Sequence, residues 1–215
     1  MDPNGYTTLL CEASGEFIIN KSRFIGYGCP CQTESDALDF LSRIRAKHKD
    51  ANHNCYAYII GKNAGIMRYS DDGEPGGTAG MPIIEVMKAY GIVDAAVVVT
   101  RYFGGVLLGT GGLVRAYTQG CKTALEAAGI VTMQKSAKWL IEVNYSIWQR
   151  LEYYLKKTPS LILDTQFTTT VVATVLINKT DESSVLKDIA RLSDGQAELL
   201  LEDTFYYPWP QQQQA

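Results

Sequence analysis

The sequence predicts a mixed α/β fold (α+β) made of two domains. Segments with strand-like alternation and segments with helical periodicity follow one another through residues 1–130. The second half has the simpler order β-α-β-β-α-β, which is that of the ferredoxin-like split βαβ unit. The composition is typical of a globular protein, since 46% of the residues are hydrophobic and 20% are charged. A chain of 215 residues can therefore bury a sizeable core without disulfides or a metal.

The first domain is expected to begin with a hairpin and a helix. Residues 17–31 mix aromatic and β-branched residues around a Lys-Ser-Arg interruption, as two short strands do. Thr33 is placed to cap the following helix, with Asp36 at the third helical position. Residues at helical spacing form the face that should pack on the sheet: Ala37, Leu38, Leu41, Ile44 and His48.

Two strands, a loop and a second helix are expected next. Residues 53–61 and 65–70 alternate as strands, and residues 71–80 (DDGEPGGTAG) have the composition of a loop. The helix that follows tolerates Pro82 in its first turn and should end before Gly91.

The first domain should close with a buried strand and a long helix. The unbroken apolar run 94–100 predicts a strand that is covered on both faces. After a glycine-rich turn, Thr110 is expected to cap a helix that ends at Gly129. Its buried stripe is predicted to contain Leu113, Val114, Tyr117, Cys121, Leu125 and Ala128.

The second half predicts a ferredoxin-like βαββαβ domain. Its strands are expected at 139–145, 161–168, 171–178 and 198–206, and its helices at 147–157 and 184–192. The domain boundary should fall within 131–136, which gives domains at 1–133 and 134–207. The glutamine-rich tail, 208–215, is expected to be disordered.

Charge and cysteine content exclude several classes of protein. The net charge is −3, and neither half of the chain has an excess of Lys and Arg, so the bulk charge is not that of a basic nucleic-acid module. The five cysteines are odd in number and irregularly spaced, which favours free thiols in a reducing compartment. No signal peptide and no apolar run of membrane-spanning length is found, so a cytoplasmic protein without a membrane partner is expected.

The strongest candidate for chemistry is the glycine-rich segment 101–117, RYFGGVLLGTGGLVRAY. A buried strand ends at an arginine, and glycines then lead into a helix whose backbone N–H groups can approach an anion. The candidate ligand-binding residues are Arg101, Tyr102, Phe103, Gly104, Gly105, Gly109, Thr110, Gly111, Gly112, Arg115 and Tyr117. The segment matches neither the Walker A loop nor the dinucleotide fingerprint. The alternative is a turn whose glycines serve only tight packing.

A second candidate is the acidic loop. Asp71, Asp72 and Glu74 could form a carboxylate cluster for acid–base or metal chemistry, but the same residues suit turns and the start of a helix. His53 and Cys55 point to one side of a strand, where a zinc site would need two further ligands. No catalytic residue is assigned, the candidates being Asp72, Glu74 and His53, and neither a metal nor a cofactor is expected.

These same segments resemble the YigZ/Impact family. The similarity rests on His53-Asn-Cys-Tyr-Ala-Tyr, on Asp71-Asp-Gly-Glu-Pro followed by Gly77-Thr-Ala-Gly, and on Arg101-Tyr-Phe-Gly-Gly through Gly109-Thr-Gly-Gly-Leu-Val-Arg-Ala-Tyr. It spans roughly residues 15–130, and the second half is similar in layout to the C-terminal domain of the bacterial YigZ-like branch. The resemblance implies a first domain of the ribosomal-protein-S-five domain-two type. The second domain would be like the last domain of elongation factor G.

Three hypotheses of function follow. The first is a non-catalytic binding protein that engages RNA, the ribosome or a translation factor through a glycine-rich anion-binding surface, because the relatives of both implied domains contact ribosomal RNA. The second is a protein–protein adaptor in translation regulation, with self-association as a further option. The third is an enzyme acting on a small phosphorylated or nucleotide-like substrate. It requires the acidic loop, which carries Asp72 and Glu74, to converge with the glycine-rich segment at Arg101.

Overall fold

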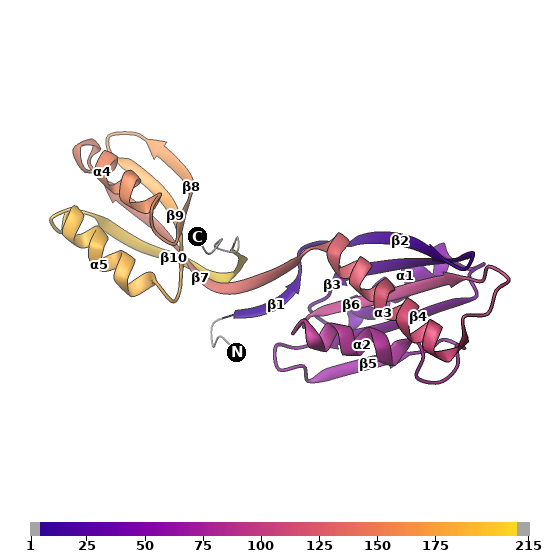
Figure 1. The fold of residues 1–215 in the computed structure, drawn as a ribbon. Helices are drawn as coiled ribbons and strands as arrows, with labels where there is room; N and C mark the ends of the chain where they lie inside the picture. The colour runs from indigo at the N-terminus through magenta and orange to yellow at the C-terminus, as the bar shows by residue number, and fades with distance from the viewer. Residues whose placement is uncertain (1–4, 210–215) are drawn as a thin grey trace. The chain divides into compact units, whose positions relative to one another are not determined.

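The computed structural model describes residues 5–209 and confirms the two-domain, mixed α+β architecture. The chain divides into two compact units. One contains Tyr6–Thr132, and the other contains Met133–Trp209 together with Gly5. We call them the N-terminal and C-terminal units and describe each by itself (Figure 1).

A five-stranded antiparallel sheet forms the centre of the N-terminal unit, in the order β2-β3-β6-β4-β5. The strands are β2 (Ala13–Ile19), β3 (Ser22–Pro30), β4 (His53–Ile60), β5 (Ile66–Ser70) and β6 (Ala95–Tyr102). The central strand β6 is buried along nearly its whole length, as its apolar run predicts. Near its end, Arg101 is paired with Phe24 on β3 and with His53 on β4.

Three helices cover the two faces of this sheet (Figure 1). α1 (Glu34–Lys47) packs on one face, while α2 (Gly80–Ala89) and α3 (Gly109–Ala128) pack on the other. The predicted cap of α1 is confirmed, because Thr33 and Asp36 form a reciprocal capping box. Phe40, and not Leu38, completes the buried face of α1; Leu38 is exposed.

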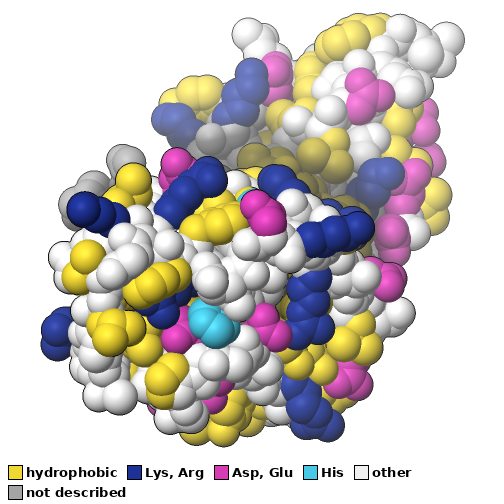
Figure 2. All heavy atoms as spheres, turned by 90° about the vertical axis from the view of Figure 1, so that its right-hand side faces the viewer, with side chains coloured by type: hydrophobic (Ala, Val, Ile, Leu, Met, Phe, Trp, Pro, Cys, Tyr) yellow, Lys and Arg dark blue, Asp and Glu magenta, His cyan; other side chains and the backbone are white. Residues whose placement is uncertain are grey.

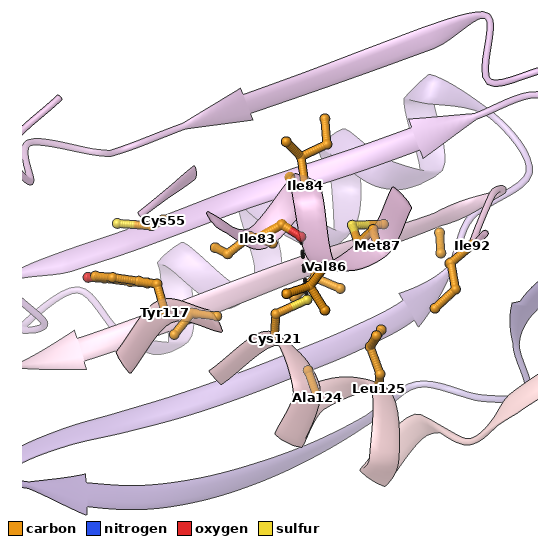
Figure 3. Packing of buried hydrophobic residues seen from close by; sticks show 14 of the residues in the cluster. Cys55, Ile83, Ile84, Val86, Met87, Ile92, Tyr117, Cys121, Ala124 and Leu125 are labelled. Atoms are coloured by element: carbon orange, nitrogen blue, oxygen red, sulfur yellow. Dashed lines mark hydrogen bonds between the residues drawn. The ribbon is translucent and has the colours of Figure 1, made fainter. Parts of the chain in front are cut away.

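The core beneath α2 and α3 contains both aliphatic and polarisable side chains (Figure 3). Tyr117 and Cys121 on α3 and Ile83 and Met87 on α2 are fully buried there. The thiol of Cys121 donates a hydrogen bond to the carbonyl oxygen of Ile83, which ties the two helices together. Val114, expected in the same stripe, is partly exposed at the edge of a groove between the helices.

Glycines permit the close approach of α3 to the sheet. A Cβ atom added to Gly26 on β3 would lie 2.1 Å from the carbonyl oxygen of Gly120 on α3. A Cβ atom added to Gly120 would in turn lie 2.7 Å from a methyl group of Val99. The middle of the helix therefore rests directly on the backbone of β3.

The segment in which the domain boundary is expected lies within a continuous strand, and the two compact units meet there between Thr132 and Met133. β7 (Ile130–Val143) runs through residues 131–136 without a break, because β10 (Glu198–Pro208) pairs with it from Met133 onward. Its polar composition hides the strand signal. At the start of the chain, β1 (Gly5–Leu9) forms a parallel bridge between Thr7 and Ile92.

The C-terminal unit has the predicted ferredoxin-like topology. The order along the chain is β7, α4 (Tyr145–Leu155), β8 (Ser160–Phe167), β9 (Val171–Asn178), α5 (Glu182–Leu192) and β10. In this sheet β7 pairs with β10 and β9, β9 pairs with β8, and β1 is a fifth strand beside β7, while both helices contribute to one apolar core. Pro208 and Trp209 belong to the ordered structure, so the expected disordered tail is wrong at these residues. Residues 210–215 lie outside the described part. None of the described helices is long and apolar enough to cross a membrane.

Candidate functional site

The N-terminal unit contains an open cavity of about 490 Å³ at the end of its central strands. The acidic loop contributes Gly73–Pro75 to its wall, and the strand ends contribute His53 and Arg101. The opposite wall is formed by Phe103 and by the residues that lead into α3, Leu107–Thr110. The two segments singled out by sequence therefore share one cavity, of the size that small ligands occupy.

Glu74 forms the floor of this cavity. Its Oε1 atom accepts a hydrogen bond from Nη1 of Arg101 at 2.6 Å and another from the hydroxyl of Tyr117 at 2.7 Å. Only 3% of the Glu74 side chain and 7% of the Arg101 side chain are exposed. Such a buried ion pair is held by its hydrogen bonds, and loss of either partner leaves an uncompensated charge.

The guanidinium of Arg101 is held by Glu74 and by two aromatic rings. Phe24 and Phe103 lie over it, with ring centroids 5.6 Å and 5.5 Å from Cζ. Its Nε atom is buried and has no hydrogen-bond partner within the described residues. The charge of Arg101 is therefore balanced by Glu74 and does not stand free as an exposed anion ligand.

Tyr117, which was expected among the ligand-binding residues, lies in the core. Its ring is completely buried, so it cannot stack on a ligand in this conformation. Burial raises the pKa of its hydroxyl, and the nearby Cys55 and Glu74 raise it further, which keeps the phenol protonated as a donor to Glu74. Burial likewise raises the pKa of the Cys55 thiol, which donates to the carbonyl oxygen of Asp71.

His53 faces the free side of Glu74. Its Nδ1 atom lies 2.8 Å from the carbonyl oxygen of Asp72, and since a carbonyl only accepts, Nδ1 carries the proton. In the neutral ring Nε2 is then an acceptor. It lies 3.9 Å from Oε2 of Glu74, which is beyond hydrogen-bond distance.

The other two acidic residues serve the loop itself. Asp71 accepts hydrogen bonds from the backbone N–H groups of Gly77, Ala79 and Gly80, and so satisfies the start of α2. Asp72 accepts one from the backbone of Asn54. Among the described residues no group of three potential ligands could hold a metal ion. The turn interpretation thus explains Asp71 and Asp72, whereas Glu74 belongs to the cavity.

The start of α3 differs from the prediction. Leu108 is the N-cap residue, no side chain caps the helix, and Thr110 already lies within its first turn. A side-chain cap needs an extended residue before the helix, which Thr110 is not. The first turn carries no acidic residue, and Gly109 and Thr110 line the cavity. The free N–H groups and positive end of a 20-residue helix therefore border the cavity.

One cationic and one aromatic side chain of the same segment are exposed. Arg115 is exposed, and one of its terminal nitrogens lies 3.7 Å from the position that a Cβ atom would take on Gly111. It forms no hydrogen bond or ion pair within residues 5–209. Phe103 is 45% exposed although one of its faces covers Arg101. Gly112, in the same first turn, is half-buried against Leu108.

Gly111, Gly112, Arg115 and Tyr117 lie outside the cavity lining, as do Tyr102, Gly104 and Gly105. A Cβ atom on Gly104 would lie 2.0 Å from the backbone of Lys21, and its N–H donates to Ser22, so this glycine serves packing. Gly105 has a φ of +82°, which favours glycine. The hydroxyl of Tyr102 lies 2.8 Å from Nδ1 of His48 and donates to Asp50.

Sequence analysis missed the role of His48. Its Nε2 atom lies 2.6 Å from the hydroxyl of Tyr27, so the imidazole joins β3, the end of α1 and β6 in one buried network. Burial and the neighbouring Lys47 lower its pKa. No local sequence pattern predicts such a network, because its members are far apart in the chain.

The end of the N-terminal unit combines several kinds of surface (Figure 2). A histidine side chain reaches the surface between acidic side chains, with apolar side chains on one side and Lys and Arg side chains on the other. A mixed surface of this kind suits a ligand that has both apolar and charged parts.

Comparison with known proteins gives the same division of the chain. Residues 20–125 match the Impact N-terminal domain, and residues 141–196 match a domain of unknown function, DUF1949. IMPACT family member YvyE of Bacillus subtilis (strain 168) is 33% identical over 196 residues, which cover 91% of this chain and 90% of the relative. IMPACT family member YigZ of Escherichia coli (strain K12) is 33% identical over 186 residues, covering 85% and 90%.

A solved crystal structure, described as that of a hypothetical protein, is also similar. It is 29% identical to this chain, with a TM-score of 0.59, and the match covers 93% of this chain and 98% of the other.

Proposed function

Because the chain belongs to the Impact family, we propose that it is a non-catalytic binding protein whose N-terminal cavity engages single-stranded RNA of the translation apparatus. Family membership supports a binding or regulatory role. The observation that carries the proposal is the juxtaposition, around one cavity, of an uncapped helix start and an exposed aromatic ring. Phosphate groups bind at helix N-termini, and unstacked bases bind on aromatic side chains.

Local groups supply what the bulk charge does not. Arg115 has no partner within the described residues, and the first turn of α3 has no carboxylate to compete with a phosphate. With a net charge of −3, few phosphate contacts are available, so a short and weakly bound RNA segment is expected. A cavity of about 490 Å³ suits the binding of one or two nucleotides. A longer RNA segment would need a continuous basic groove.

An enzyme is the second candidate, since Glu74 and Arg101 do converge. His53 and Glu74 could act as acid and base on a small phosphorylated substrate. However, the two nucleophilic groups beside them, Cys55 and Tyr117, are buried and protonated, because burial raises the pKa of both. This favours binding over covalent catalysis. Turnover of a nucleotide by the purified chain, lost in His53→Phe, would reverse that order.

The test is RNA binding measured by fluorescence anisotropy across a range of salt concentrations. For Arg115→Ala we expect weaker binding and a salt dependence shallower by about 0.7 in log K against log salt, the value for one phosphate contact on a single strand. Lys122→Ala is the matched control, because it removes the same charge from the same helix away from this cavity. No RNA binding by the wild-type chain, or equal effects of the two variants, would contradict the proposal.

A further inference from the structure

An unused hydrogen-bond acceptor lies at the floor of the cavity. Oε1 of Glu74 accepts both hydrogen bonds of that carboxylate, from Arg101 and Tyr117. Oε2 accepts none within the described residues, and Glu74 lines the cavity. A carboxylate oxygen with free acceptor capacity at a cavity wall is a place where a ligand donor can bind.

A second acceptor lies beside it. The carbonyl oxygen of Asp72 holds a proton of His53 on Nδ1, so Nε2, 3.9 Å from Oε2 of Glu74, is the ring atom that accepts when the imidazole is neutral. With the ring in that form, the floor presents two adjacent acceptors. Two adjacent donors on one edge of a ligand would satisfy both.

The charges around the floor favour a neutral ligand edge over a cationic one. Arg101 compensates the charge of Glu74 at 2.6 Å, and the positive end of α3 borders the same cavity. An arginine or lysine side chain of a partner would bring its donors together with a positive charge that these groups repel. A neutral donor edge avoids that cost.

We infer that the cavity selects guanine among the RNA bases, by pairing its N1–H and 2-amino donors with Glu74 and His53. This inference rests on the proposed RNA binding. Guanine is the one standard RNA base whose Watson–Crick edge carries two adjacent donors. Adenine and cytosine set one donor beside an acceptor, and uracil sets one donor between two acceptors, so each would place an acceptor against Glu74 or His53. The exposed face of Phe103 and the start of α3 would hold the ring and the phosphate.

The test compares short oligouridylates that carry one central guanosine, inosine, adenosine or uridine. Inosine keeps N1–H and lacks the 2-amino group, so it removes one donor alone. We expect the guanosine oligonucleotide to bind about tenfold or more tightly than each of the others, because a site built for a donor rejects an analogue that lacks it. Equal binding of guanosine and inosine would overturn the inference while leaving RNA binding in place. Absence of binding by all four would overturn the proposed function as well.

Two variants connect the preference to these residues. Glu74→Gln replaces an acceptor by a donor at nearly constant shape and should abolish the guanosine preference, while Glu85→Gln, the same change at an exposed position of α2, should keep it. His53→Phe leaves the ion pair intact and should reduce the preference, so the inference remains testable if Glu74→Gln does not fold. A guanosine preference unchanged in a folded Glu74→Gln or His53→Phe variant would contradict it.

Discussion

Oε1 of Glu74 lies 2.6 Å from Nη1 of Arg101, although the two residues are 27 positions apart in the chain. This contact joins the acidic loop to the end of β6, which were the two separate candidates in the sequence. The contact also distinguishes the buried residues of the site from the exposed ones. Arg101 is a buried partner of Glu74, the exposed groups at the cavity border are Phe103 and the start of α3, and Arg115 is exposed on the same helix.

The ion pair should be important for stability of the N-terminal unit. We expect Glu74→Ala to destabilise it by about 3–5 kcal/mol, because Arg101 would remain buried without a counter-charge. Glu85→Ala breaks an exposed pair with Lys88 and should have little effect. Hydrogen–deuterium exchange of the β6 amides measures this locally, since the three tryptophans belong to the C-terminal unit. Equal exchange in both variants would show that the pair is dispensable.

The contact between α3 and β3 leaves no room for a methyl group. Gly26→Ala would place Cβ 2.1 Å from a backbone oxygen of Gly120, so we expect a loss of about 1–3 kcal/mol or more in the free energy of unfolding. Gly76→Ala is the matched control, because no heavy atom lies within 4 Å of its Cβ position and its φ is not positive. Denaturant unfolding followed by circular dichroism compares the two. A Gly26→Ala chain as stable as Gly76→Ala would contradict the close packing.

The buried His48 network should make stability depend on pH. Burial, followed by Lys47, lowers the pKa of His48 in the folded state below the value of about 6.5 expected in the unfolded chain. The unfolded state therefore binds the proton more readily, and stability is lost as the pH falls through the unfolded value toward the folded one. Thermal unfolding between about pH 7.5 and 5.5 should show this decline in the wild type and a flatter profile in His48→Gln. The same slope in both proteins would assign the decline to other groups.

Phe103 should contribute to RNA binding through its exposed face. We expect Phe103→Ala to weaken binding by about 1–3 kcal/mol, the range for loss of one base–aromatic stack. Phe167→Ala, an exposed phenylalanine of the C-terminal unit, serves as the control. Because Phe103 also covers Arg101, the fold of each variant must be checked by hydrogen–deuterium exchange. Similar losses in both variants would argue against a stacking role in the cavity.

Local patterns predicted most of the fold. The capping box at Thr33, the buried strand before Arg101 and the βαββαβ order of the second half all follow from short-range signals, and the structure contains each of them. The continuous strand β7 could not be predicted in the same way. Residues 131–136 are mostly polar, and from Met133 onward β10 supplies hydrogen bonds to them from far along the chain.

The candidate site was predictable in place but not in detail. Spacing identified the two loops, yet it could not show which carboxylate would face Arg101, because that depends on the turn between Asp71 and Glu74. Tyr117 had two predictions, as a core residue and as a ligand group, and only its helical position foretold its burial. The tautomer of His53 depends on a carbonyl oxygen of the acidic loop, which no sequence pattern specifies.

The most direct test of nucleotide binding in the N-terminal cavity is a nuclear magnetic resonance titration of the isotope-labelled chain with an oligouridylate that carries one guanosine. The largest amide shifts are predicted at His53, Phe103 and Gly109, which line the cavity, with smaller shifts in the C-terminal unit. Shifts confined to Met133–Trp209, or no shifts at saturating RNA, would contradict binding at this cavity.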